Sequence, residues 1–205
     1  MKNKSKEEEI KKFDLLASDW DQKIPEKSIE YADQLVKRLN ITNEHSLLDV
    51  AAGTGIIYSR LQCIDVYPQR YVAVDISNNM LKELKAKYLN AETCCADFEE
   101  EFSMNYWFDF VIIFNGIPHF DNINMVFLNV YNNLKNNGKL IIVHARTRHE
   151  LEEHHKRIGY VGKIDPIPND DKLIELSQKY QFRNVCIEDE KYFCYIGERT
   201  LHSIE

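Results

Sequence analysis

Three aspartates and a glycine-rich turn are the residues of this chain whose types and spacing best suit ligand chemistry. Asp49 lies in the stretch LLDVAAGTGI, which also contains Gly53 and Gly55. Glycine tolerates a positive φ and lets a ligand approach the backbone closely. Asp75 ends the apolar stretch YVAVD, 20 residues after Gly55, and Asp97 ends the stretch TCCAD. Carboxylates at these places accept hydrogen bonds from hydroxyl, amine or ammonium groups.

This pattern fits a positively charged nucleoside better than a dinucleotide. The dinucleotide fingerprint has a third glycine where this chain has Tyr58. A charged Asp49 beside the turn repels a pyrophosphate but suits an ammonium group. Asp75 is placed to accept both hydroxyls of a ribose, and Asp97 is placed to accept from an adenine amine. S-adenosylmethionine carries an ammonium group, a ribose and an adenine, so it is the ligand that this pattern predicts.

Structural roles for the same aspartates stay open at this point. Asp49 is also compatible with capping the helix that follows it. Asp75 and Ser77 form an Asp-x-Ser pair, which is a helix-start signature. Asp97 is followed closely by three glutamates, which fits a solvated face.

Histidines form a second group of chemically capable residues. His119 follows an apolar run in the segment NGIPHF, where it could act as a base, bind a substrate, contact a lid, or cap the next helix together with Asp121. His149, His154 and His155 lie in the segment 144–163 among several arginines and lysines.

The spacing of the later histidines argues against a helical metal site. His149 and His154 are about 140° apart around a helix, and no two of these histidines are four residues apart. We expect no metal here. The open alternatives are that His149, His154, His155 and Tyr160 bind an acceptor molecule, or that they lie on a solvated cap helix in which His154 pairs with Glu150 and His149 with Glu153.

The apolar runs and turn residues predict the elements that position these side chains. Strands are expected at 46–51, 71–76, 93–97, 108–115, 139–145, 182–189 and 191–200. Helices are expected around 13–20 and 28–39, then up to about residue 62, and at 78–89, 125–134 and 170–180, with Asn136-Asn137-Gly138 stopping the fifth. This alternation predicts a Rossmann-like α/β fold. Its seven-stranded sheet would be mostly parallel, with an antiparallel C-terminal edge hairpin and helices on both faces.

Length and composition predict one cytoplasmic domain. The chain has 205 residues, which we divide into a helical lid at 1–45, the sheet, and an inserted cap segment at 146–169. A net charge of −7 makes nucleic acid an unlikely partner. No apolar run reaches the roughly 20 residues of a membrane helix. The charged N-terminus is no secretory signal, and the five Cys lack a CxxC pair and a disulfide framework.

The motifs resemble the class I S-adenosylmethionine-dependent methyltransferases, from about Phe13 to the end of the chain. LLDVAAGTG is similar to the first motif of that family with Ala51 in place of its first glycine, and VDIS with Met80 is similar to the second. ADFEE, FDFVIIFNGIPHF and LKNNGKLIIV resemble the third motif, the fourth strand with its loop, and the entry to the fifth strand.

The resemblance implies S-adenosylmethionine as cofactor, with S-adenosylhomocysteine as product. The residues it implies for cofactor binding are Trp20, Asp49, Ala51, Gly53, Gly55, Asp75, Ile76, Met80, Asp97, Phe98 and Asn115. It implies His119 as a catalytic residue and Trp20 as a lid residue that touches the methionine or the acceptor. Packing of Trp20 against Phe13 and Leu16 remains the alternative.

The acceptor that the resemblance implies is a small molecule. Family members that methylate nucleobases or glutamine amides carry an N/D-P-P-Y/F box where this chain has NGIP, and IPHFD is similar to the small-molecule branch. The alternatives are a protein or RNA methyltransferase, or a non-catalytic module that binds S-adenosylmethionine. The motifs indicate neither the acceptor atom nor the oligomeric state.

Overall fold

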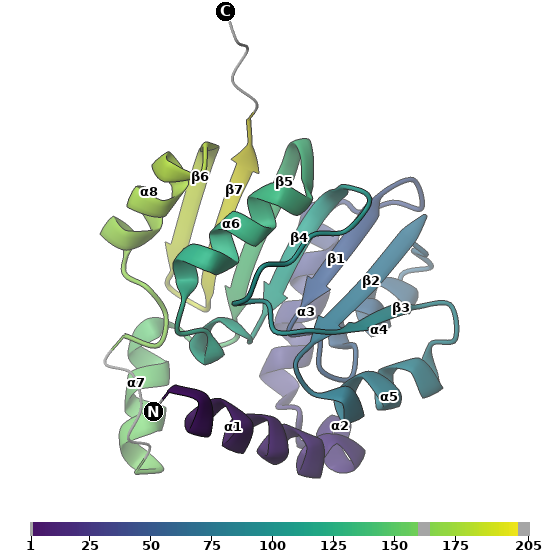
Figure 1. The fold of residues 1–205 in the computed structure, drawn as a ribbon, viewed down its shortest axis with the longest axis vertical. Coiled ribbons are helices and arrows are strands. Elements are labelled where there is room, and N and C mark those ends of the chain that lie inside the picture. Colours follow the sequence, from purple (N-terminus) through teal and green to yellow (C-terminus); the bar gives the residue numbers. More distant parts are fainter. Residues whose placement is uncertain (1, 160–164, 201–205) are drawn as a thin grey trace, which may run out of the picture. The chain divides into compact units, whose positions relative to one another are not determined.

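The computed structural model describes residues 2–159 and 165–200, with side chains from Lys6 onward (Figure 1). Tyr160, an expected acceptor residue, lies outside the described residues. No helix in the described ranges is long and apolar enough to cross a membrane.

Seven strands form one mixed sheet in the order β3-β2-β1-β4-β5-β7-β6. The strands are β1 (Ser46–Val50), β2 (Arg70–Asp75), β3 (Glu92–Cys95), β4 (Phe108–Phe114), β5 (Leu134–His144), β6 (Phe182–Asp189) and β7 (Phe193–Arg199). β7 runs antiparallel to both of its neighbours, β5 and β6. The predicted fold class, a mostly parallel sheet with an antiparallel hairpin at its C-terminal edge, is therefore confirmed.

Helices and short 3₁₀ turns connect the strands. They are α1 (Lys2–Leu16), η1 (Ala17–Asp19), α2 (Trp20–Lys23), α3 (Glu26–Leu39), α4 (Ile56–Gln62), α5 (Asn78–Lys87), η2 (Ile117–His119), α6 (Ile123–Asn133), α7 (Arg148–Arg157) and α8 (Asp170–Lys179). The chain divides into two compact units, one up to Phe98 and one from Glu99 onward, and each is described by itself.

In the first unit, β1, β2 and β3 are parallel and their carboxyl ends are in register. Asp49 lies opposite Ala73, and Asp75 lies opposite Cys95. All five residues of β1 are buried, as a strand covered on both faces requires. Figure 1 shows α3 and α4 behind these strands. The helix expected around 13–20 is interrupted, because α1 ends at Leu16 and η1 turns the chain before α2 begins.

In the second unit, β4 and β5 are parallel and α6 lies across them in Figure 1. The predicted helix stop at 136–138 is wrong. The helix ends at Asn133, and β5 begins at once with Leu134 pairing to Phe108. Pairing then shifts register, with Asn137 at φ 62°. A Cβ on Gly138 would lie 2.9 Å from the Phe108 carbonyl oxygen, so the close approach of the two strands requires glycine.

The segment expected as an inserted cap contains α7. Thr147 accepts a hydrogen bond from the Glu150 backbone N–H, and the Glu150 carboxylate accepts one from the Thr147 N–H. This reciprocal pair is a capping box, which stabilises a helix start. Leu151 is the buried residue of α7, so one apolar contact anchors an otherwise polar helix.

Candidate cofactor and acceptor sites

The turn after β1 has the backbone conformation that its glycines predict. Gly53 and Gly55 have φ of 54° and 91°, and Ala51 has φ of 56° in the same left-handed region. The N–H groups of Ala52, Gly53 and Gly55 donate to the Val74 carbonyl, the Asp75 carboxylate and the Ala52 carbonyl. A turn that binds a pyrophosphate points its N–H groups at the ligand. These three N–H groups already have protein acceptors, which disfavours a phosphate ligand.

Asp75 connects the end of β2 to this turn. One carboxylate oxygen accepts from the Gly53 N–H and the other from the Ser77 N–H, each at 2.8 Å. The residue is buried, with 8% of its surface exposed. A carboxylate oxygen has room for more than one hydrogen bond, so Asp75 has the acceptor capacity that a pair of ribose hydroxyls requires.

Asp49 lies within the first unit's core at the end of β1. It is 1% exposed, and its carboxylate accepts a hydrogen bond from the Tyr71 hydroxyl at 2.6 Å. Burial raises the pKa of Asp49 to about 7, and the nearby negative charge of Asp75 raises the pKa further. Asp49 therefore acts on the turn as a buried charge. Sequence reasoning did not identify Tyr71, although its place on the neighbouring strand, two residues before the partner of Asp49, is the signal for it.

The two glycines of the turn serve different purposes. A Cβ on Gly55 would lie 3.0 Å from Leu84, so this glycine allows close packing of the turn on α5. A Cβ on Gly53 would meet only the Trp20 indole nitrogen, at 3.6 Å. Tyr58, at the place of the third dinucleotide glycine, packs against the Tyr71 ring with centroids 4.3 Å apart. The backbone face at Gly53 is thus the approachable part of the turn, and Trp20 lies next to it.

The N-terminal segment is attached to this turn and to the start of α5. Asp14 in α1 accepts hydrogen bonds from the Ser77 hydroxyl and the Asn79 N–H. Asp21 in α2 accepts from the Thr54 hydroxyl, and its other oxygen pairs with Lys87.

Trp20 contacts the Phe13 ring edge to face, with centroids 5.8 Å apart. The side chain therefore packs on Phe13 and also lies near Gly53, so both expected roles of Trp20 remain compatible with its position.

The remaining expected cofactor residues of the first unit lie near the ends of β2 and β3. Asp97 forms an ion pair with Lys6 of α1. Phe98 and Met80 are 3% and 2% exposed, and Ile76 is half-buried. Phe98 and Met80 thus contribute to the packed base of the site, while Asp97 already has a cationic partner on the N-terminal helix.

In the second unit, Asn115 and His119 follow β4. Asn115 has φ of 56°, and its side-chain oxygen accepts from the Ala145 N–H, which ties this loop to the end of β5. His119 is exposed at the end of η2. The alternative in which His119 and Asp121 cap the next helix is wrong, because Asn122 accepts from the Met125 N–H and forms the cap.

The His-rich segment places its residues differently from the predicted pairing. His154 Nδ1 lies 3.4 Å from the Arg157 guanidinium, and Glu153 pairs with Lys156. His149 is exposed and His155 is half-buried. Among residues 2–159 and 165–200, no group of three or more His, Cys, Asp or Glu lies close enough to hold a metal ion.

His144 and Arg146, which sequence reasoning did not select, lie beside these histidines. His144 is the last residue of β5, and its Nδ1 lies 3.1 Å from the backbone nitrogen of Arg146. Burial lowers the pKa of His144 to about 4, and the positive charges of Arg146, His119 and His155 lower it further. Burial is also the main cause that lowers the pKa of His155, followed by His119 and Arg146. Residues from β5, η2 and α7 therefore share one local electrostatic environment.

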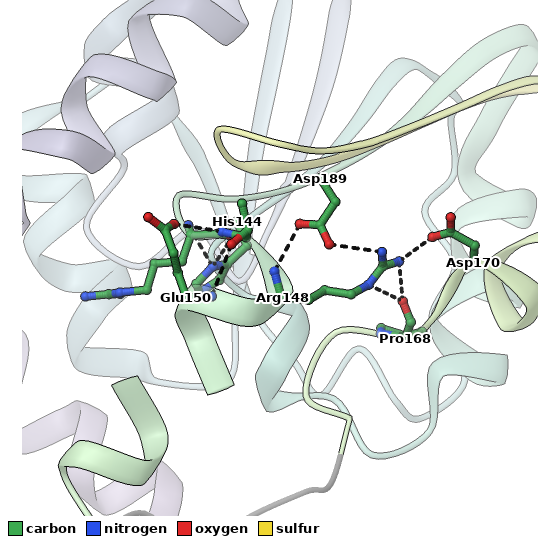
Figure 2. A network of polar contacts seen from close by, with 8 residues as sticks. His144, Arg148, Glu150, Pro168, Asp170 and Asp189 are labelled. Atoms are coloured by element: carbon green, nitrogen blue, oxygen red, sulfur yellow. Dashed lines mark hydrogen bonds and ion pairs between the residues drawn. The ribbon is translucent and has the colours of Figure 1, made fainter. Parts of the chain in front are cut away.

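Arg148 holds the start of α7 in place (Figure 2). Its guanidinium pairs with Asp189 and Asp170, donates to the Pro168 carbonyl, and lies 4.6 Å from the centroid of the Phe193 ring. Its backbone N–H donates to Asp189. This arginine is fully engaged in connecting α7 to the start of α8 and to the hairpin between β6 and β7.

Comparison with protein families finds a match to a model described as a methyltransferase domain, over residues 48–142. A curated relative, the ubiquinone/menaquinone biosynthesis C-methyltransferase UbiE of Wigglesworthia glossinidia brevipalpis, is 32% identical over 111 residues. That alignment covers 51% of this chain and 44% of the relative, so the chain spans less than half the length of the protein it matches.

Solved structures share the fold at low sequence identity. The complex of the Haloferax volcanii Trm112 activator with its putative methyltransferase matches with a TM-score of 0.72 and 14% identity, covering 92% of this chain and 98% of that one. Phosphoethanolamine N-methyltransferase 2 of Haemonchus contortus, in complexes with S-adenosylhomocysteine or S-adenosylmethionine, matches with a TM-score of 0.66 and 17% identity, covering 84% of this chain and 53% of that one. The domain match, the relative and the shared fold support a class I S-adenosylmethionine-dependent methyltransferase, as the motifs predict.

Proposed function

We propose that this protein transfers a methyl group from S-adenosylmethionine to a small-molecule acceptor, as a single methyltransferase domain. The observation that carries the proposal is the turn after β1, whose N–H groups at Ala52, Gly53 and Gly55 are used within the protein while Asp75 lies beside it. Such a turn is unsuited to a pyrophosphate and suits a ligand with hydroxyl donors and positive charge.

The residues of the first unit fit this cofactor. Asp75 would accept the ribose hydroxyls, and the buried charge of Asp49 would favour the positively charged methionine end from behind the turn. Trp20 would cover the Gly53 backbone, from which it is already close. Asp97 would bind the adenine amine after exchanging its ion pair with Lys6.

The cofactor supplies a methyl group already activated on a sulfonium, so the protein mainly has to align the acceptor and exclude water. Asn115 positions the loop after β4 through its bond to the Ala145 N–H. His119 is exposed on that loop and would orient the acceptor or take its proton. His149, His154, His155 and Tyr160 remain proposed acceptor contacts.

Asp75→Ala tests the cofactor assignment directly. We expect calorimetry to show S-adenosylmethionine binding weakened by on the order of 1–3 kcal/mol, because charge-assisted hydrogen bonds are lost. The same change leaves the Gly53 and Ser77 N–H groups without their acceptor. Thermal unfolding therefore has to show that the variant is still folded at the titration temperature. Unchanged affinity in a folded variant, or displacement of the cofactor by NADH, would refute the assignment.

Two other functions are distinguishable by experiment. Incubation with a labelled methyl donor and a metabolite extract should label a small molecule. Label in protein or RNA would instead favour the macromolecular alternative. Binding of S-adenosylmethionine without any labelled product would favour a non-catalytic cofactor-binding module.

A further inference from the structure

The ends of β4 and β5 bring together three imidazoles and one guanidinium. His144 ends β5, Arg146 follows it by two residues, His119 ends η2 after β4, and His155 lies in α7. The strand ends are adjacent, since Phe114 pairs with Val143. The bond from the Ala145 N–H to Asn115 then holds the two following loops together. We call His119, His144, Arg146 and His155 the basic cluster.

Arg146 differs from Arg148 in having no counter-charge. Arg148 is bound by Asp170, Asp189 and Pro168. The half-buried Arg146 forms no hydrogen bond or ion pair from its guanidinium to any acidic side chain within residues 2–159 and 165–200. Its charged neighbours within reach are His144, His154 and His155. A partly desolvated guanidinium without a carboxylate is costly in a protein of net charge −7, unless an anion completes it.

We propose that the basic cluster binds an oxyanion, a carboxylate or a phosphate, carried by the methyl acceptor. The proposal rests on the proposed function, since it assigns the chemical class of that acceptor. The guanidinium of Arg146 can donate two parallel hydrogen bonds to either group. The imidazoles add N–H donors, and the backbone of Arg146 holds the His144 ring in place.

A metal ion fits the cluster less well. The fixed positive charge of Arg146 repels a cation, and no metal-binding group of three or more His, Cys, Asp or Glu occurs in the described part of the chain. The N-terminus of α7 is not the anion site either. Its N–H groups at Arg148 and Glu150 already donate to Asp189 and Thr147.

Bound anion should take up a proton in the cluster. Burial and the charges of His119 and Arg146 lower the pKa of His155, so this ring is neutral near pH 7 in the free protein. The neighbouring charges from α7 are His154 and Arg157, which are also positive. An oxyanion offsets this repulsion and raises the pKa of His155, so binding should strengthen as the pH falls from about 8 to about 6.

Titration of the full chain with inorganic phosphate tests the cluster. Calorimetry at pH 6 should show saturable binding, and imidazole ¹⁵N spectra should show shifts at His144 and His155. Arg146→Gln should weaken binding at least tenfold, and Arg157→Gln, which removes an exposed arginine of the same charge from α7, should change it less than twofold. Equal losses in the two variants, or no saturable binding to the wild-type protein, would overturn the proposal.

Further titrations separate this proposal from the proposed function and identify the source of the oxyanion. Acetate and phosphate, compared at equal ionic strength, report whether the cluster prefers a carboxylate or a phosphate. Asp75→Ala should lose S-adenosylmethionine affinity and retain phosphate binding. Phosphate binding without S-adenosylmethionine binding would support the cluster and refute the methyltransferase. S-adenosylmethionine binding together with zinc binding at these histidines, and no phosphate binding, would overturn the cluster alone.

Discussion

At the residue scale, the first unit contains a carboxylate whose protonation depends on its surroundings. Asp49 is at the carboxyl end of a fully buried strand, and the Tyr71 hydroxyl is the hydrogen-bond donor to it. Burial outweighs that hydrogen bond and raises the pKa of Asp49 to about 7. Since an unfolded aspartate has its pKa near 3.8, the folded protein binds a proton here that the unfolded chain releases.

Asp49→Asn should therefore change how stability depends on pH. A raised folded-state pKa contributes stability that is fully present below about pH 3.8 and is lost as the pH rises through about 7. The free energy of unfolding of Asp49→Asn, relative to wild type, should become more favourable by up to roughly 4 kcal/mol between pH 4 and pH 8. Urea denaturation across this range measures it. Asp19→Asn, which changes an exposed residue, is the control, and a pH-independent difference for Asp49→Asn would contradict the burial argument.

At the element scale, the N-terminal segment is held by side chains rather than by its own helical tendency. α1 is polar, and its Asp14 accepts two hydrogen bonds from the start of α5. Ser77, one of the donors, is fully buried and also caps α5 through the Met80 N–H. The attachment of α1 thus depends on a residue that the sheet and α5 already hold rigidly.

Asp14→Ala should loosen α1 without unfolding the first unit. Loss of two charge-assisted hydrogen bonds, each worth roughly 1.5–3 kcal/mol, should raise the amide hydrogen exchange of α1 by at least tenfold. Exchange in β1 and β2 should stay unchanged. Asp19→Ala is the matched control, because its carboxylate is exposed and only 4.0 Å from Lys23 on the same segment. Equal exchange in both variants would show that Asp14 does not anchor the helix.

At the scale of the whole molecule, two buried groups have opposite effects on stability over the same pH range. His144 has a folded-state pKa of about 4 against 6.5 for an ordinary histidine. Its contribution is therefore present above pH 6.5 and is lost as the pH falls toward 4. The contribution of Asp49 falls as the pH rises through much of that window, so the two slopes oppose each other in the wild-type protein.

The single and double variants should separate these slopes. Between pH 4.5 and 6.5, Asp49→Asn should gain stability with rising pH relative to wild type, because the slope from His144 is then unopposed. His144→Gln should lose stability over the same range, and the double variant should follow the wild-type slope. Denaturation series on all four proteins test this additivity. Parallel curves for the two single variants would contradict it.

Local sequence patterns were sufficient for most of the fold and for the cofactor half of the site. Apolar runs place β1, β2 and β4, and glycine with a following acid marks the turn and Asp75, because these signals depend on neighbours in the chain. The failures involve contacts between distant segments. The stop expected at Asn137 is a strand irregularity, because pairing of Leu134 to Phe108 competes with helix continuation and wins. Such pairing has no local signature.

By itself, therefore, the sequence determined the order of strands and helices, the turn conformation around Gly53, and the positions of acidic side chains at strand ends. Only the tertiary structure decided which charges are neutralised. It buries Asp49 against Tyr71, pairs Asp97 with Lys6, and surrounds Arg148 with acceptors while Arg146 faces only imidazoles. The physical reason is that desolvation and Coulomb interactions depend on distance in space, and residues two apart in sequence can meet entirely different partners.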